Sequence, residues 1–223
     1  MEKIIIVGNK QFAELAYYQF CSEPNYEVLA FAVDRAYLDN TVFLGLPVIA
    51  YEALQSNFDM QDVSLFIAIG IAQCNRLREQ KFNQVKQDGY RLTSFISSKA
   101  SVLGPLTVGE NVMIMEGCYL HPRVSIEDNV VVWTGTRIAM HSTVAKHCWV
   151  TSAVIGERCH IGNNTFIGLN ATINPNIRVA EFNVIDAGAV IGHDTLPKQV
   201  YRGFRSKPSK IDSDKVFSRD LLN

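Results

Sequence analysis

An aliphatic residue recurs at every sixth position through the second half of the chain. The positions are Ile96, Val102, Val108, Ile114, Leu120, Ile126, Val132, Ile138, Val144 and Val150. After Val150 the spacing shortens by one residue, and the pattern resumes at Ile155, Ile161, Ile167, Ile173, Val179, Ile185 and Ile191. A short fixed period over such a length predicts a solenoid, in which each coil packs mainly on its two neighbours.

The positions between the aliphatic residues refine this prediction. The residue after each aliphatic position is often Gly, Ala or Asp, and the fifth position of each hexapeptide is small or β-branched. This pattern predicts short, flat strands joined by tight bends. Cys118, Cys148 and Cys159 occupy fifth positions. We therefore expect them to be buried small side chains in a reducing cytoplasm, and neither disulfides nor zinc ligands.

Residues 1–92 follow a different rhythm. Expected strands are Lys3–Gly8, Glu27–Asp34, Gly45–Ile49 and Ser64–Gly70, and expected helices are Phe12–Phe20 and Arg76–Asp88. Alternating strands and helices predict a small, Rossmann-like α/β domain with a parallel sheet, whose ligands bind at the carboxyl ends of the strands. The predicted domains are residues 1–92, a solenoid over 93–208 and a tail over 209–223.

Composition, charge and the length of the apolar runs argue against nucleic acid, secretion and membrane insertion. The 223 residues are 48% hydrophobic and 19% charged, with a net charge of −1, which is typical of a globular protein and gives no reason to expect nucleic acid as a partner. The apolar run Ile4–Val7 is too short for a signal peptide, and no stretch approaches the roughly 20 apolar residues that span a bilayer. We expect a cytoplasmic protein without membrane insertion.

Four stretches carry a resemblance to a known family. They are Lys3–Gly8 with Asp34, Phe43–Val48, Phe66–Gly70 with Asn75 and Arg76, and the repeats from Ile96 onward. Over residues 1–208 the chain resembles the hexapeptide-repeat sugar acyltransferases of the PglD and NeuD type. The resemblance implies a left-handed parallel β-helix after the α/β domain, and transfer of an acyl group from an acyl-CoA, acetyl-CoA first among them, to a nitrogen or oxygen of a nucleotide-linked sugar used in surface polysaccharides or glycans. It also implies a homotrimer with acyl-CoA between neighbouring β-helices, and no metal.

The resemblance also implies a general base. The stretch Thr134–Val144 matches the family segment that holds the catalytic histidine, which makes His141 the candidate. As the fourth residue of its hexapeptide, His141 should point out of the coil. The family usually has an acidic residue next, whereas this chain has Ser142, so a different group would have to orient the imidazole. His147 occupies the fourth position of the next hexapeptide, and we expect it on another face, exposed and without a role.

Further residues are candidates for binding. For acyl-CoA they are Gly156 beside the shortened spacing, which we expect to interrupt the coil wall, together with Gly168, Ala187, Gly188, Arg205 and Lys207. The glycines offer backbone N–H groups to an oxyanion, although each is also the glycine that a tight bend requires. For the nucleotide sugar the candidates are Gly8, Asn9, Lys10, Asp34, Arg35 and Gly70. The segment Gly8–Lys10 is not a dinucleotide fingerprint, but a phosphate can bind at the start of the following helix.

Two other functions remain open at this stage. A zinc hydro-lyase of the γ-carbonic anhydrase type uses a similar solenoid with three histidine ligands, but His121 is out of register with His141 and His147. A non-catalytic homologue that only binds a sugar nucleotide would be consistent with Ser142 and with the weakly defined Gly8–Lys10 segment.

Overall fold

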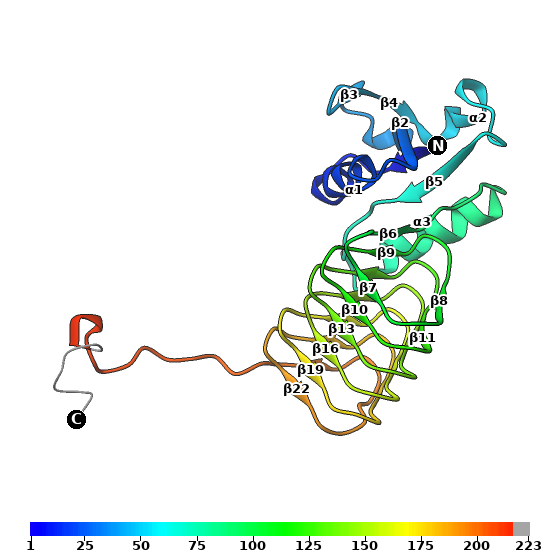
Figure 1. The fold of residues 1–223 in the computed structure, drawn as a ribbon. Coiled ribbons are helices and arrows are strands. Elements are labelled where there is room, and N and C mark those ends of the chain that lie inside the picture. The colour runs from blue at the N-terminus through cyan, green and yellow to red at the C-terminus, as the bar shows by residue number, and fades with distance from the viewer. Residues whose placement is uncertain (216–223) are drawn as a thin grey trace.

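The computed structural model describes residues 1–215, which form an α/β part and a stack of parallel coils (Figure 1). The α/β part holds five strands: β1 (Glu2–Val7), β2 (Tyr26–Val33), β3 (Val42–Phe43), β4 (Leu46–Ala50) and β5 (Val63–Ile67). Their order in the sheet is β3-β4-β2-β1-β5, and only β3 runs antiparallel to its neighbour. The parallel strands thus follow the order of the first half of a doubly wound sheet. Their carboxyl ends share one edge, as the sequence predicted.

Two longer helices cover this sheet. Helix α1 (Gln11–Cys21) buries Phe12, Ala13, Ala16 and Phe20, one stripe of a helix with a 3.6-residue period. Helix α3 (Arg76–Gln87) buries Phe82 and Val85, and both helices lie where the sequence predicted them. Tyr51–Asn57 also forms a 3₁₀ turn, η2 (Tyr51–Ala53), followed by the short helix α2 (Leu54–Asn57), which was not predicted. Its four helical residues are too few to show a periodic apolar pattern. Two further 3₁₀ turns are η1 (Arg35–Tyr37) and η3 (Ser213–Lys215).

The remaining strands form three parallel sheets that wrap a common interior. Sheet I contains β6 (Phe95–Ile96), β9 (Met113–Ile114), β12 (Val131–Val132), β15 (Trp149–Val150), β18 (Phe166–Ile167), β21 (Val184–Ile185) and β23 (Val200–Tyr201). Sheet II contains β7 (Ser101–Val102), β10 (Tyr119–Leu120), β13 (Arg137–Ile138), β16 (Val154–Ile155), β19 (Thr172–Ile173) and β22 (Val190–Ile191). Sheet III contains β8 (Leu106–Val108), β11 (Val124–Ile126), β14 (Thr143–Val144), β17 (His160–Ile161) and β20 (Arg178–Val179).

Successive strands of each sheet come from successive coils, which confirms the solenoid that the six-residue pattern predicted. The strands pair in parallel, so the solenoid is a parallel β-helix, as the family resemblance implied. Leu120 pairs with Ile138 one coil later, and most of the predicted aliphatic positions are buried in one continuous core. Cys118, Cys148 and Cys159 lie in the same core, which confirms their predicted burial. Ile96 and Val102 are 38% and 37% exposed because they belong to the first coil, which has no coil before it to cover them.

The shortened spacing after Val150 falls at a corner of the coil. Ile138 pairs with Ile155, a step of one residue fewer than the step from Leu120 to Ile138, yet the ladders of sheets I and II continue on both sides. Ser152 adopts a φ of 42° at this corner, and its hydroxyl donates a hydrogen bond of 2.7 Å to the carbonyl of Thr134. The expectation that the shortened spacing interrupts the coil wall is therefore wrong, because a tighter corner absorbs the missing residue.

Each corner carries a column of residues with positive φ, one per coil. The corner between sheets III and I stacks Asn111, Asn129, His147 and Asn164, whereas the corner between sheets II and III stacks Arg123, His141, Arg158 and Asn176. Asparagine tolerates this left-handed conformation better than most residues. His141 and His147 thus occupy different corners, as their spacing predicted.

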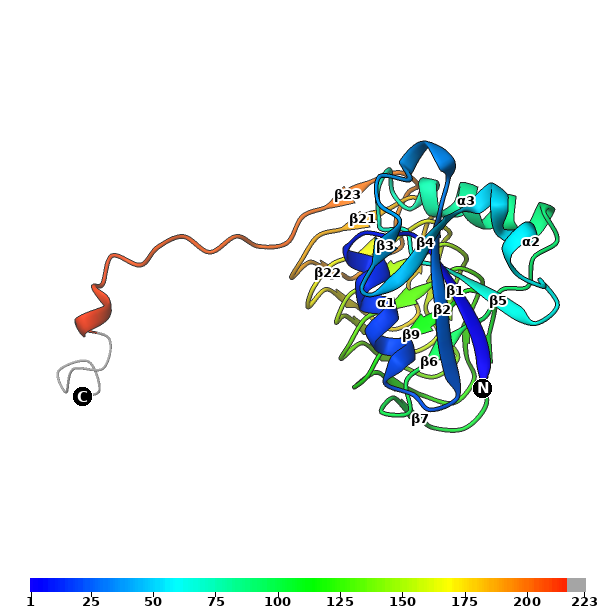
Figure 2. The ribbon, with the colours of Figure 1, turned by 90° about the horizontal axis from the view of Figure 1, so that it is seen from above.

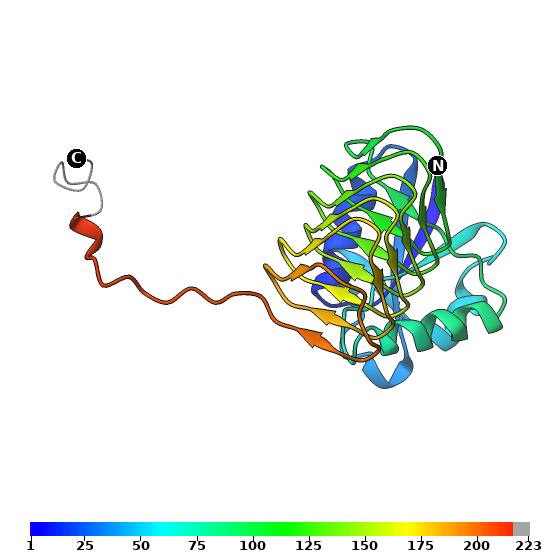
Figure 3. The same cartoon turned by 90° about the horizontal axis from the view of Figure 1, so that it is seen from below.

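The two parts of the chain share one hydrophobic core. Helix α1 lies between the sheet of the α/β part and sheet I of the β-helix, so that Phe20 and Phe66 pack in the same cluster as Met113, Val131 and Trp149. In the view from above, α1 overlies the coils (Figure 2). On the other side of the α/β sheet, α3 runs beside the coils (Figure 3) and covers a second cluster. The two helices and sheet I therefore enclose the space below the carboxyl ends of the strands.

Candidate functional site

A cavity of about 1540 Å³ occupies this space between the two parts of the chain. It is bounded by the start of α1, by one side of α3, by the carboxyl ends of β1, β2 and β5, and by sheet I with its following corner. Ligands of parallel sheets bind at such strand ends, and pockets between domains are preferred ligand sites. The cavity is therefore the first candidate site of the molecule.

The end of the cavity nearest the α/β sheet is polar. Gly8, Asn9 and Lys10 connect β1 to α1, and no side chain in the described part of the chain caps the start of this helix. Gly8 has a φ of 134°, and a Cβ at this position would lie 2.6 Å from the carbonyl oxygen of Ala68, so only glycine fits here. Uncapped backbone N–H groups at a helix start favour an anion, which here would face the cavity.

Asp34 and Lys81 are in direct contact at the same end of the cavity. The Lys81 ammonium forms a short ion pair with Asp34 and donates a hydrogen bond of 2.7 Å to Gln84. It also lies 4.4 Å from the centre of the Tyr51 ring. The side chain of Lys81 is 8% exposed, whereas that of Asp34 is 34% exposed. Lys81 thus fixes the Asp34 carboxylate at the cavity wall, where it remains accessible to a ligand.

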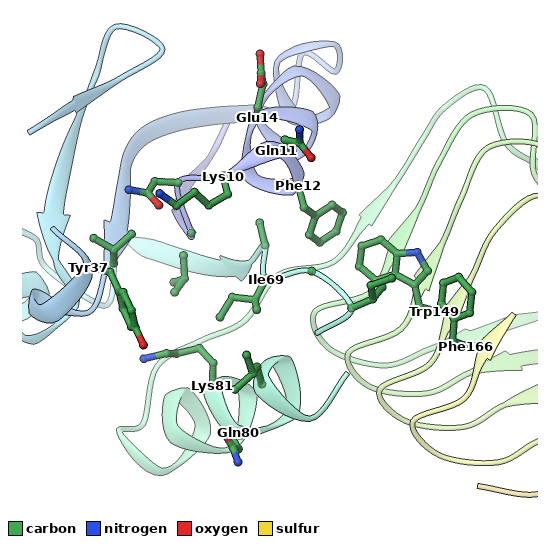
Figure 4. A pocket seen from close by; sticks show the side chains of 18 of the residues that line it. Lys10, Gln11, Phe12, Glu14, Tyr37, Ile69, Gln80, Lys81, Trp149 and Phe166 are labelled. Atoms are coloured by element: carbon green, nitrogen blue, oxygen red, sulfur yellow. The ribbon is translucent and has the colours of Figure 1, made fainter. Parts of the chain in front are cut away.

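The side of the cavity that faces sheet I is apolar and aromatic (Figure 4). Phe12 lies with its ring centre 4.7 Å from that of Trp149, and Trp133 lies 5.7 Å from Trp149. Phe166 lines the same wall one coil further on. Leu169 adds an apolar side chain that is 56% exposed at the corner after sheet I. The cavity therefore offers polar groups toward the α/β sheet and flat apolar surfaces toward sheet I.

Seven of the predicted binding residues line this cavity. They are Gly8, Asn9, Lys10, Asp34 and Gly70 from the α/β part, and Gly168 and Ala187 from the β-helix. Residues predicted for the sugar and for acyl-CoA thus meet in one place. This meeting could not be read from the sequence, since the two groups are about a hundred or more residues apart along the chain.

The other predicted residues lie outside the cavity wall. They are Arg35, His141, Gly156, Gly188, Arg205 and Lys207. The backbone N–H of Arg35 binds the carboxylate of Glu52, and Gly188 is a corner residue with a φ of 68°. Arg205 and Lys207 belong to the exposed segment after β23, and Arg205 Nη2 lies 4.0 Å from Asp186 Oδ2.

The glycines expected to donate to an oxyanion are already engaged. The N–H of Gly168 donates to the carbonyl of Ile185 at 2.8 Å, and the N–H of Gly156 donates to Ile173 at 2.9 Å. A Cβ on Gly168 would lie 2.7 Å from the backbone nitrogen of Ala187, so this glycine is required by close stacking of the coils. Both residues serve the β-helix ladder, as the alternative interpretation of the sequence held.

His141 lies at the corner between sheets II and III, across the β-helix from the sheet that lines the cavity. Its side chain is exposed and its φ is 62°. Ser142 points inward, where its hydroxyl donates to the carbonyl of Gly156 at 2.7 Å and accepts from the N–H of Cys159 at 3.0 Å. Ser142 therefore does not orient the His141 imidazole, and within one chain His141 does not reach the cavity.

His147 is buried, which contradicts the expectation that it is exposed. It is 6% exposed and packs edge-on against Phe82 of α3, with a ring separation of 5.6 Å. Burial lowers the pKa of His147 to about 4, because the charged form would lose its hydration. Position within the hexapeptide did not reveal this burial, because α3 covers this particular corner of the β-helix.

Two residues of α3 were missed at the sequence level. Lys81 lines the cavity, and Arg78 is fully buried behind the Trp149 side of the cavity wall. Both lie on the same face of α3 as Phe82 and Val85. A cation on the apolar stripe of a helix was the available signal, since such residues are rarely buried without a specific reason.

Within residues 1–215, no group of three or more metal-ligating side chains is arranged to hold a metal ion. The helices of that same range include none with the length and apolar character needed to cross a bilayer.

Comparison with known proteins shows which solved structures share this fold. A family model described as the GMPPB C-terminal domain matches residues 102–204. The acetyltransferase domain of PglB from Neisseria gonorrhoeae superposes with a TM-score of 0.80 over 92% of this chain and 100% of that chain, at 20% sequence identity. PerB from Caulobacter crescentus, solved with CoA and GDP-perosamine, gives a TM-score of 0.77 over 91% of this chain and 98% of that chain, at 24% identity.

The curated relatives match about half of this chain or less. Galactoside O-acetyltransferase from Escherichia coli is 27% identical over 110 residues, which cover 43% of this chain and 51% of that protein. The chain thus spans about half of this relative, and about a third of the mannose-1-phosphate guanylyltransferases that it also matches. The resemblance inferred from the sequence is confirmed at the level of architecture: the chain has the hexapeptide-repeat β-helix fold of the PglB and PerB acetyltransferases.

Proposed function

We propose that this protein is an acyltransferase that moves an acyl group, acetyl first among them, from an acyl-CoA to an amine or hydroxyl of a nucleotide-linked sugar. The observation that carries the proposal is the cavity, whose polar end at Gly8–Lys10 and Asp34 continues along sheet I to Gly168 and Ala187. The fold is that of neighbours solved with CoA and GDP-perosamine, which supports the same pair of ligands here. A role in surface polysaccharide or glycan synthesis, in the cytoplasm, is part of this proposal.

Within this proposal, each end of the cavity has a task. Diphosphate oxygens would accept hydrogen bonds from the first N–H groups of α1, and Asp34 would accept hydrogen bonds from ribose hydroxyls. The sugar would extend over Trp149 and Phe166 toward the corner at Gly168. Acyl-CoA supplies the activated acyl group. Of the residues at that corner, Leu169 has a backbone N–H without an acceptor among the described residues, and we assign it the thioester oxygen.

The general base must come from another copy of the chain. His141 and the cavity lie on opposite sides of one β-helix, so only a neighbouring subunit can bring the imidazole to the acceptor. A homotrimer with its sites between subunits satisfies this requirement. His141 would take the proton from the attacking amine or hydroxyl, and the CoA thiolate would leave.

The first experiment measures release of CoA thiol with a panel of UDP-, dTDP- and GDP-linked amino and deoxy sugars. Turnover by the wild type together with its loss in His141→Ala, at unchanged thermal stability, is the expected result. Near-normal turnover of His141→Ala would remove His141 from the mechanism, and no turnover with any acyl-CoA and sugar pair would sink the proposed activity.

Mixed assemblies test the shared site. We expect neither His141→Ala nor Asp34→Ala to be active alone, whereas co-expressed subunits recover about a quarter of the wild-type rate, because that share of random neighbours combines an intact base with an intact cavity. Absence of recovery in assemblies shown to be mixed would contradict a site built between subunits.

A second candidate is a non-catalytic homologue that binds a sugar nucleotide. The exposed His141 imidazole makes no hydrogen bond to any described residue, so nothing within the subunit orients it as a base. Binding of a nucleotide sugar without consumption of any acyl-CoA in the same panel would favour this candidate.

A further inference from the structure

Arg78 is a fully buried cation in the wall between α3 and the β-helix. Its side chain is 0% exposed, and Nη2 donates a hydrogen bond of 3.1 Å to the carbonyl of Cys148. Among residues 1–215, the Nε and Nη1 atoms have no hydrogen-bond partner. Burial lowers the pKa of Arg78 to about 9, which leaves the guanidinium charged at neutral pH.

No carboxylate within residues 1–215 forms an ion pair with Arg78. The acidic residue next to it on α3, Glu79, instead accepts a hydrogen bond from Asn164 and faces His147. Burying an unpaired charge is costly, and an apolar residue of similar size would usually stabilise a fold more. The stability of the fold therefore does not account for an arginine at this position.

The guanidinium lies directly behind the aromatic wall of the cavity. Its central carbon is 5.3 Å from the centre of the Trp149 ring. Trp149 lines the cavity, and its ring centre is 4.7 Å from that of Phe12, the second residue of α1. Tightly packed aromatic rings thus separate Arg78 from the start of α1. A dry layer of this kind screens the charge of Arg78 much less than water would.

The charged side chains of the cavity wall do not by themselves favour an anion. The wall carries four acidic residues, Glu14, Asp34, Asp39 and Asp186, against two lysines, Lys10 and Lys81. Lys81 is already paired with Asp34. An anionic ligand at the start of α1 therefore needs a further positive charge nearby, and Arg78 is the buried one.

We propose that Arg78 is a specificity-determining residue, which acts through Trp149 to favour the diphosphate group of the ligand in the cavity. The proposal rests on the assignment of the cavity to a nucleotide-linked sugar. Over the roughly 10 Å that the two ring separations span, and at an effective dielectric constant of about 20, one unit charge changes affinity by roughly tenfold. Arg78 would touch no substrate atom, and its contribution would concern the charged part of the ligand alone.

The test compares binding of UDP, GDP and dTDP with binding of the corresponding uncharged nucleosides, by calorimetry on the full chain. For the diphosphate that the wild type binds, we expect Arg78→Met to raise Kd about tenfold or more, while Kd of its nucleoside changes less than twofold. Arg78→Lys, which keeps the charge, should restore most of the diphosphate affinity. Arg76→Met is the matched control, because Arg76 lies on the same helix, 4.4 Å over the Phe182 ring, and does not line the cavity.

Several outcomes decide the matter. An unchanged diphosphate Kd in Arg78→Met, or an equal loss for diphosphate and nucleoside, overturns the proposal in favour of a purely structural role. If Arg78→Met does not fold, Arg78→Gln keeps a donor for the Cys148 carbonyl without the charge and is judged by the same two ratios. If the wild type binds no nucleoside diphosphate, the assignment of the cavity to a nucleotide-linked sugar fails, and this proposal fails with it. If the wild type binds the diphosphate and Arg78→Met binds it equally well, only the proposal for Arg78 fails.

Discussion

The Nδ1 atom of His147 lies 2.9 Å from the side-chain amide nitrogen of Asn129, one coil earlier at the same corner of the β-helix. Asn111 fixes the orientation of that amide, because its own NH₂ group donates to Asn129 Oδ1 at 2.8 Å. Asn129 therefore donates, and His147 accepts through an unprotonated Nδ1. Asn111 in turn accepts a hydrogen bond from the N–H of Ile67 in β5. This ladder joins the β-helix to the α/β sheet, and it requires a neutral histidine.

The first prediction concerns acid stability. The folded pKa of His147, about 4, lies below the ordinary value of 6.5, so the unfolded chain binds a proton more readily than the folded chain. Stability from this residue is complete above pH 6.5 and is lost as the pH falls from 6.5 toward 4, by roughly 3 kcal/mol in all. Urea unfolding at pH 7.5, 6, 5 and 4.5 measures the slope.

Two asparagine variants isolate the contribution of His147. His147→Asn removes the titrating imidazole, so the loss of stability between pH 6.5 and 4 should flatten. Asparagine is tolerated here because it already fills the left-handed position in the neighbouring coils, at Asn129 and Asn164. His141→Asn is the matched control, with a φ of 62° at both histidines and an exposed side chain at His141. An identical pH slope in all three proteins would refute the role of His147.

Two glycines at the cavity respond differently to a methyl group. Gly8→Ala should destabilise the fold by about 2 kcal/mol or more and weaken nucleotide binding, because the φ of 134° and the nearby Ala68 carbonyl exclude a Cβ. Gly70 lines the same cavity, but a Cβ there would have no described atom within 4 Å, so Gly70→Ala should change the unfolding free energy by less than about 0.5 kcal/mol. Thermal denaturation of both variants decides; equal effects would contradict the close approach at Gly8.

The pair of Lys81 and Asp34 gives the third prediction. Asp34→Asn leaves a nearly buried ammonium without its carboxylate, and we expect a loss of about 1–2 kcal/mol in unfolding free energy. Lys81→Met with Asp34→Asn removes both charges and should recover most of that loss. A double-mutant cycle in guanidinium chloride measures the coupling. Additive effects would show that the pair contributes nothing.

Ser142 provides the fourth prediction. An acidic residue in this place cannot serve His141, since the side chain at position 142 points toward the carbonyl of Gly156. Ser142→Asp should lower stability by about 2 kcal/mol or more by burying a carboxylate, without raising any acyl transfer rate. Ser142→Ala, which loses only the two hydrogen bonds, is the milder reference. Faster turnover in Ser142→Asp would show that the acid does reach the base.

Sequence periodicity predicted the architecture well because it reports local requirements. The aliphatic positions from Ile114 to Ile191 are buried simply because every coil repeats the same geometry. The environment of His147 and Arg78 escaped prediction for the opposite reason. Both are determined by where α3 packs against the β-helix, a contact between segments 70 or so residues apart, on which the hexapeptide pattern bears no information. The cavity likewise exists only through that packing.

The shared core around α1 has a consequence for how the chain folds. Residues such as Phe20 and Phe66 are covered partly by Met113, Val131 and Trp149 of sheet I. A fragment ending at residue 92 would leave that surface open to water, and we expect such a fragment not to fold on its own. We expect the two parts to unfold in a single cooperative transition. On this expectation, the α/β part acquires its ligand-ready shape only together with the coils beneath it.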